Sequence, residues 1–154
     1  MYKGLILCHP KNVYVDENGK IVNHWYSDVM KENFSDFIFE TVDILNGGTY
    51  QDDCFSDKFI NLHTAEYDIL ISPDAGGKWY KLQEGKDLFS FKILLINMLK
   101  FLKQTCIIIL DKFIYPEFRK LSVEILQEFG FNIIPKTYDI YSHEYKKTIY
   151  AERI

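Results

Sequence analysis

The residues best placed to do chemistry follow one short apolar strand. Tyr67-Asp-Ile-Leu-Ile71 ends abruptly at Ser72-Pro-Asp-Ala-Gly-Gly77, a polar loop that contains a glycine pair. Open α/β sheets bind ligands at the carboxyl ends of their strands, so this loop predicts a binding site. Asp74 has two open interpretations, a carboxylate in the site or a turn residue that caps its own loop.

Polar residues also stand where other predicted strands end. His9 follows the apolar run Lys3–Cys8, Asp43 lies near the end of a strand predicted over Phe37–Leu45, and Asp53 lies in the short segment that follows. Each is either a ligand-binding residue or an ordinary polar residue at a strand end. No two of the four histidines have the spacing of metal ligands, so we expect no metal site.

The second half of the chain has the clearest elements. A long apolar helix is predicted over Leu88–Gln104 and a buried strand over Cys106–Leu110. A second helix begins at Pro116 and ends at Gly130. The last element is an antiparallel hairpin made of residues 131–141 and 146–153. This order predicts an α/β fold whose sheet is parallel except near one edge.

The first half gives weaker signals. A small hairpin is expected around Asn18-Gly19, a helix over Ser27–Phe34, and a strand over Thr49–Ser56. The 154 residues predict a single domain spanning 1–154. The helix Leu88–Gln104 is apolar around most of its circumference, and we expect part of that surface to form a homodimer.

Composition narrows the classes of function. The net charge of −4 argues against a dominant nucleic-acid groove. The three cysteines, Cys8, Cys54 and Cys106, lack paired spacing, so we expect a reducing, cytoplasmic location. The most apolar window, Phe89–Leu102, contains two lysines and is too short for a membrane span, so no membrane partner is expected.

From about Asp43 onward the chain resembles the class I, S-adenosylmethionine-dependent methyltransferases. In that family an acid at a strand end holds the ribose, as Val42-Asp43-Ile44 suggests, and an acid after the next strand lies near the adenine, where Asp53 stands. Tyr67 to Asp74 matches the family's aromatic-aspartate-strand-proline element. The resemblance implies a three-layer, Rossmann-like sandwich with an antiparallel C-terminal strand. It also implies S-adenosylmethionine as cofactor, bound by His9, Asp43, Asp53, Ser72, Pro73, Gly76 and Gly77.

One departure from the family leaves two hypotheses for the function. These enzymes have a glycine-rich turn after the first strand, where the backbone approaches the cofactor closely. This chain has Cys8-His-Pro-Lys-Asn12 there, without glycine. The first hypothesis is a divergent methyltransferase that acts on a small molecule or a nucleic acid. The alternative is a catalytically inactive binding or assembly module with the same fold.

Two narrower resemblances concern the loops after the strands. In 2′-O-ribose methyltransferases a lysine–aspartate–lysine–glutamate set deprotonates a ribose hydroxyl, and Asp74 and Lys112 match two of its places. That resemblance implies Asp74 and Lys112 as catalytic residues. Ser72–Gly77 is also similar to a loop of phosphoribosyl pyrophosphate synthetases. The later strand, however, ends at Asp111 without that family's paired acids and glycine-rich turn, so we reject this reading for the whole chain.

Overall fold

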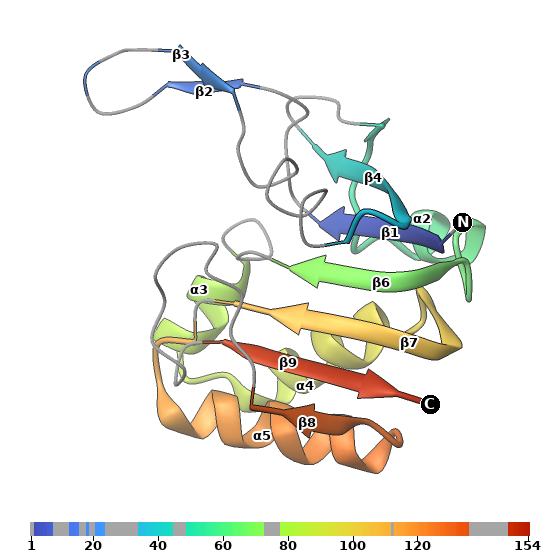
Figure 1. Ribbon diagram of the computed structural model, residues 1–154. Helices are drawn as coiled ribbons and strands as arrows, with labels where there is room; N and C mark the ends of the chain where they lie inside the picture. Colours follow the sequence, from blue (N-terminus) through green and yellow to red (C-terminus); the bar gives the residue numbers. More distant parts are fainter. Residues whose placement is uncertain are drawn as a thin grey trace.

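A mixed seven-stranded β-sheet forms the centre of the fold in the computed structural model (Figure 1). The structure describes residues 2–7, 13–15, 18, 21–23, 34–44, 49–72, 78–111, 113–135 and 148–154. The strand order is β5-β4-β1-β6-β7-β9-β8. These strands are β1 (Tyr2–Leu7), β4 (Phe37–Asp43), β5 (Tyr50–Gln51), β6 (Tyr67–Ser72), β7 (Leu102–Leu110), β8 (Asn132–Ile134) and β9 (Ile149–Arg153).

The direction of the last strand confirms the predicted fold class. Strands β5, β4, β1, β6 and β7 are parallel, whereas β9 pairs antiparallel with both β7 and β8. The C-terminal strand therefore inserts into the main sheet, between β7 and β8. The predicted small hairpin is also present, as β2 (Val13–Val15) paired antiparallel with β3 (Ile21–Asn23) in a separate two-stranded sheet.

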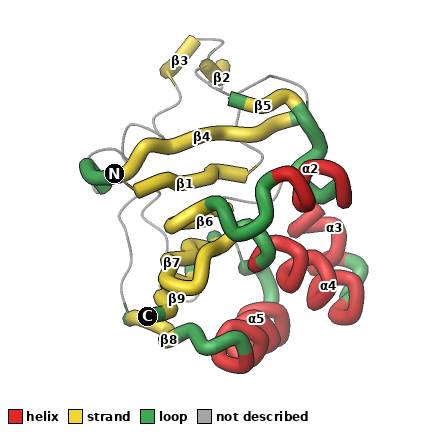
Figure 2. Tube along the Cα trace, turned by 90° about the vertical axis from the view of Figure 1, so that its right-hand side faces the viewer, coloured by secondary structure: helices red, strands yellow, loops and turns green. Residues whose placement is uncertain are grey.

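The described helices all cover the same face of the sheet, as Figure 2 shows. They are α2 (Asp57–Leu62), α3 (Lys78–Glu84), α4 (Leu88–Leu99) and α5 (Pro116–Glu128). The larger apolar core lies between these helices and the sheet, and its biggest fully buried side chains include Trp79, Phe91 and Phe118. The helix predicted over Ser27–Phe34 lies, except for Phe34, outside the described residues. None of the helices in the described ranges is long and apolar enough to span a bilayer.

The helix predicted over Leu88–Gln104 ends at Leu99, and its last five predicted residues were wrong. Leu102–Gln104 belongs to β7. No glycine or proline marks the end of α4, so the apolar sequence pattern continues from the helix into β7. Tertiary hydrogen bonds determine where the helix ends, because the N–H groups of Ala65 and Tyr67 donate to the carbonyls of Lys100 and Phe101 at 2.8 and 3.0 Å.

The strand predicted over Thr49–Ser56 is also shorter than expected. Only Tyr50–Gln51 forms a strand, and the residues after it turn into α2. Ser56 caps this helix by accepting the N–H of Phe59. Ahead of β5, Thr41 and Thr49 exchange reciprocal bonds from backbone N–H to side-chain oxygen at 3.0 and 3.1 Å. These bonds replace strand pairing at that edge.

A network of charged side chains joins β1, β4 and the segment between α2 and β6. Lys3 Nζ lies 2.7 Å from Glu40 Oε1 and also contacts Glu66. His63 Nδ1 bonds the other oxygen of Glu66. Burial of Glu66 opposes its ionisation, but the hydrogen bonds from Lys3 and His63 outweigh burial and lower the pKa of its carboxyl.

We therefore expect Glu66→Gln to change the acid stability of the protein. A carboxyl whose pKa is lowered by folding stabilises the folded state above its unfolded pKa, about 4.3, and loses this contribution as pH falls through its folded pKa. At pH 5.5 the substitution should cost about 1 kcal/mol of unfolding free energy, a typical value for a partly exposed pair. The cost should decrease as the pH falls below the unfolded pKa and through the lowered pKa of the folded state.

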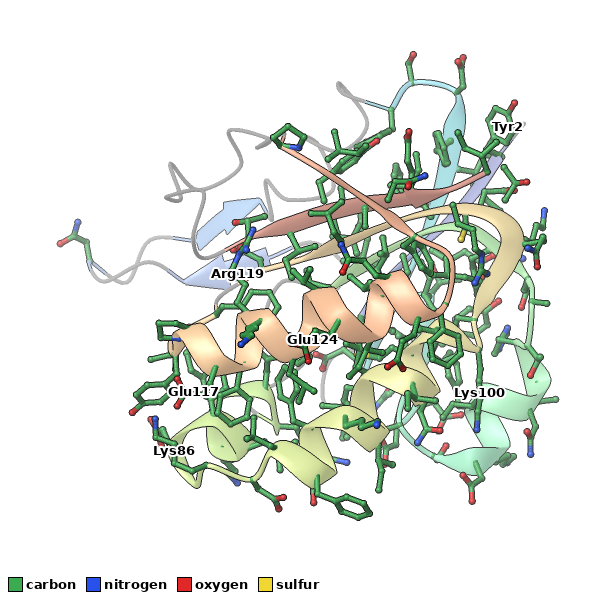
Figure 3. All side chains as sticks on the ribbon, turned by 90° about the horizontal axis from the view of Figure 1, so that it is seen from below. Tyr2, Lys86, Lys100, Glu117, Arg119 and Glu124 are labelled. Carbon is green, nitrogen blue, oxygen red and sulfur yellow. The ribbon has the colours of Figure 1, made fainter. Side chains whose placement is uncertain are left out.

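Urea unfolding at a series of pH values measures this difference. Glu124→Gln is the matched control, because Glu124 is an exposed glutamate on α5 (Figure 3). A cost for Glu66→Gln that stays constant from pH 5.5 to pH 3 would contradict the assignment.

Candidate functional site

The carboxyl ends of the parallel strands meet at one edge of the sheet, where their arrowheads point in Figure 1. Asp43 is the last residue of β4 and pairs in register with Gln51, the last residue of β5. The N–H of Asp52 donates to the carbonyl of Asp43 at 3.2 Å. Asp43 is half-buried. The sequence therefore placed Asp43 correctly at this edge, next to the turn that contains Asp53.

Asp53 has a structural role in that turn. One of its carboxylate oxygens accepts the N–H of Phe55 at 2.9 Å, and its carbonyl accepts the hydroxyl of Ser56 at 2.8 Å. The turn in this way positions Ser56, the cap of α2. A carboxylate has two oxygens, so a ligand at Asp53 would have to share the group with the turn.

Ser72 is the most unusual of the predicted site residues in the described part of the chain. It ends β6, is 1% exposed, and its buried hydroxyl has no hydrogen-bond partner among the described residues. An unsatisfied buried polar group costs about 1–3 kcal/mol. Such groups are rare in native proteins and call for a specific explanation. A polar group of a ligand at this edge would satisfy the hydroxyl.

Asp111 is a further acid at the same edge, one that the sequence interpretation did not include in the site. It follows β7 directly and is 4% exposed. Its N–H donates to the carbonyl of Ser72 at 3.0 Å, and its carboxylate accepts the hydroxyl of Thr148 at 3.0 Å. The available signal was the same as at Asp43, an acid at the end of an apolar strand.

The remaining predicted site residues lie outside the described residues. These are His9, Pro73, Asp74, Gly76, Gly77 and Lys112. Their predicted roles stay predictions. Within the described ranges, no group of three or more His, Cys, Asp or Glu side chains is arranged to hold a metal ion.

The described residues at this edge fit part of the cofactor that the sequence resemblance implies. A ribose offers two hydroxyl donors, and the carboxylate of Asp43 is an acceptor at the strand end. The buried hydroxyl of Ser72, which lacks a partner in the described part of the chain, offers one more polar contact two strands away, on the other side of β1.

Similarity to known proteins is found in the structure and not in the sequence. No protein-family model and no curated protein matches the sequence. The structure is similar to the crystal structure of an S-adenosylmethionine-dependent methyltransferase from Methanosarcina mazei, with a TM-score of 0.51 and 13% identity over 99% of this chain and 92% of that one. The CurJ carbon methyltransferase gives a TM-score of 0.43 and 14% identity, over 98% of this chain and 48% of that one. The chain has the class I methyltransferase fold, in a divergent form.

Proposed function

We propose that this chain binds S-adenosylmethionine at the carboxyl edge of its sheet and transfers the methyl group to a small molecule or a nucleic acid. The observation that carries the proposal is the row of polar side chains at this edge, which includes Asp43, Ser72 and Asp111 at the ends of β4, β6 and β7. In open α/β folds, ligands bind at this edge.

Each residue has a separate role in this proposal. Asp43 accepts hydrogen bonds from the ribose hydroxyls, and the carboxylate oxygen of Asp53 that does not accept the Phe55 N–H lies near the adenine. The buried hydroxyl of Ser72 bonds a polar group of the bound ligand and so recovers its desolvation cost. The cofactor, when bound, supplies an electrophilic methyl group on a sulfonium. The carboxylates at this edge favour that positive charge.

The predicted catalytic residues follow neighbouring strands. Asp74 comes two residues after the end of β6, and Lys112 comes two residues after the end of β7. The two strand ends are joined by the hydrogen bond from Asp111 N–H to the Ser72 carbonyl. In this proposal Lys112 removes the proton of the substrate nucleophile, and Asp74 positions that nucleophile.

A catalytically inactive binding module is the second candidate. It is favoured by the absence of glycine in Cys8–Asn12 and by the turn that occupies one oxygen of Asp53. Both features reduce the room and the acceptors left for S-adenosylmethionine. The two candidates differ in whether the cofactor binds at all.

Calorimetric titration with S-adenosylmethionine separates the two candidates. We expect a micromolar Kd, about −8 kcal/mol. Asp43→Ala should weaken binding by about 1.5–3 kcal/mol, the value of hydrogen bonds to a charged group. Ser72→Ala should weaken binding without lowering the free energy of unfolding, because it removes a buried hydroxyl that has no partner among the described residues. Glu124→Ala, an exposed acid on α5, is the control and should bind normally.

Folded protein that binds no cofactor at millimolar concentration would end the methyltransferase proposal and leave the binding module. Equal losses for Asp43→Ala and Glu124→Ala would place the cofactor elsewhere.

A further inference from the structure

The helix α4 buries most of its apolar surface within the chain. Five of its twelve residues are buried against the sheet and the neighbouring helices: Phe91, Leu94, Leu95, Met98 and Leu99. Leu88, Phe89 and Ile93 remain 43, 74 and 46% exposed. Only this smaller surface is available for the homodimer expected from the sequence.

Beside it, α3, α4 and the turn before α2 line an open groove of about 370 Å³. These helices lie together on the helical side of the sheet (Figure 2). The apolar walls of the groove include Phe55, Leu82, Ile93 and Leu94, and Lys78 and Lys81 also line it. Ile93 therefore belongs both to the groove and to the exposed ridge of α4.

The groove is basic, although the chain as a whole has a net charge of −4. Lys78 and Lys81 are exposed, and Lys78 Nζ lies 4.9 Å from the centre of the Phe55 ring. Among the described residues that line the groove there is no acid. The nearest acids along these elements, Asp53, Asp57, Glu84 and Asp87, are not part of the lining, although the Asp53 carboxylate accepts the backbone N–H of Phe55 at 2.9 Å.

We propose that this groove binds an acidic amphipathic helix of a partner protein. Apolar residues at helical spacing would pack on Phe55, Leu82 and Ile93, and the acidic face would meet Lys78 and Lys81. On α4 the groove lining runs from Ser90 to Asn97, about 10 Å along the helix axis, which is enough for about two turns of a partner helix. Charge complementarity selects this occupant.

A second copy of the chain fits the groove less well. If two copies met through this groove, Lys78 and Lys81 would bring positive charge to both sides of the interface. Like charges across an interface oppose association. None of the residues that line the groove is one that the cofactor proposal uses, so the peptide experiment tests the groove separately from the methyltransferase proposal.

Fluorescence anisotropy with a labelled synthetic peptide tests the proposal. The probe is a helical peptide of about 14 residues with leucines on one face and glutamates on the other, and the controls are a scrambled peptide and one with lysine in place of glutamate. The acidic helix should bind at least about tenfold more tightly than either control, and raising the salt concentration should weaken its binding.

Matched variants locate the binding site. Ile93→Glu should weaken binding more than about tenfold and Lys81→Glu about fivefold, because they remove an apolar wall and reverse a charge. Lys120→Glu reverses an exposed lysine on α5 and should bind within about twofold of wild type. Equal binding of the acidic and scrambled peptides, or no effect of Ile93→Glu, would overturn the proposal.

Sedimentation velocity of the protein alone tests the competing occupant. A monomer at about 100 μM supports a groove open to another protein. A dimer that Ile93→Glu dissociates would overturn our proposal and establish the homodimer expected from the sequence.

Discussion

Gly4→Ala should destabilise the protein by about 3 kcal/mol, the upper end of the usual cost of overpacking a core. A Cβ atom at Gly4 would lie 2.5 and 2.6 Å from ring carbons of Phe39 and 2.7 Å from Cγ2 of Ile69. Gly4 lies in β1, between β4 and β6, and pairs in register with both of these residues. The backbone is held on both sides, so it cannot move away.

Equilibrium unfolding in urea measures this cost. Phe39→Leu in the same chain should recover part of it, because the smaller side chain makes room on one side of the new methyl group. A double-mutant cycle then isolates the Gly4–Phe39 contact. Gly85→Ala is the matched control and should cost less than about 1 kcal/mol, because its nearest contact would be one backbone oxygen at 3.2 Å. Simple additivity of Gly4→Ala and Phe39→Leu would contradict this explanation.

The central sheet was predictable because its signals are local. The strands β1 and β6 are mainly apolar runs, β4 and β6 end at the polar residues Asp43 and Ser72, and the C-terminal hairpin carries its own pattern of pairing. The helices α2 and α3 were missed because six or seven residues are too few to establish a helical period. The cap at Ser56 was the only clear signal.

The positions of Asp43, Asp53 and Ser72 in the fold followed from the sequence, but their interactions did not. That Asp43 and Asp53 follow adjacent strands could be expected from strand order. That Asp53 bonds its own turn, and that the Ser72 hydroxyl is buried without a partner among the described residues, depends on how neighbouring elements pack. The sequence pattern contains no information on that packing.

Gln83→Leu should also destabilise the protein by about 3 kcal/mol, because Gln83 in α3 supports the first residues of α5. Gln83 lies in α3 and is fully buried. Its side-chain oxygen accepts the N–H groups of Ile114 and Tyr115 at 2.7 and 3.4 Å, and its amide donates to the carbonyl of Trp79 at 3.2 Å. Tyr115 is the N-cap residue of α5 and provides no side-chain cap of its own. Gln83 therefore satisfies the N–H groups that lead into α5.

Leucine has a similar size but leaves these groups without a partner, at about 1–3 kcal/mol for each one that stays buried. Hydrogen exchange should show the loss locally, with faster exchange in the first turn of α5, where Phe118 and Arg119 donate to the Tyr115 carbonyl. Gln127→Leu, at an exposed position on α5, is the matched control. If both variants were equally stable, α5 would not need a cap from α3. The prediction requires Gln83→Leu to be the less stable of the two variants, because Gln83 accepts the N–H groups of Ile114 and Tyr115 that lead into α5.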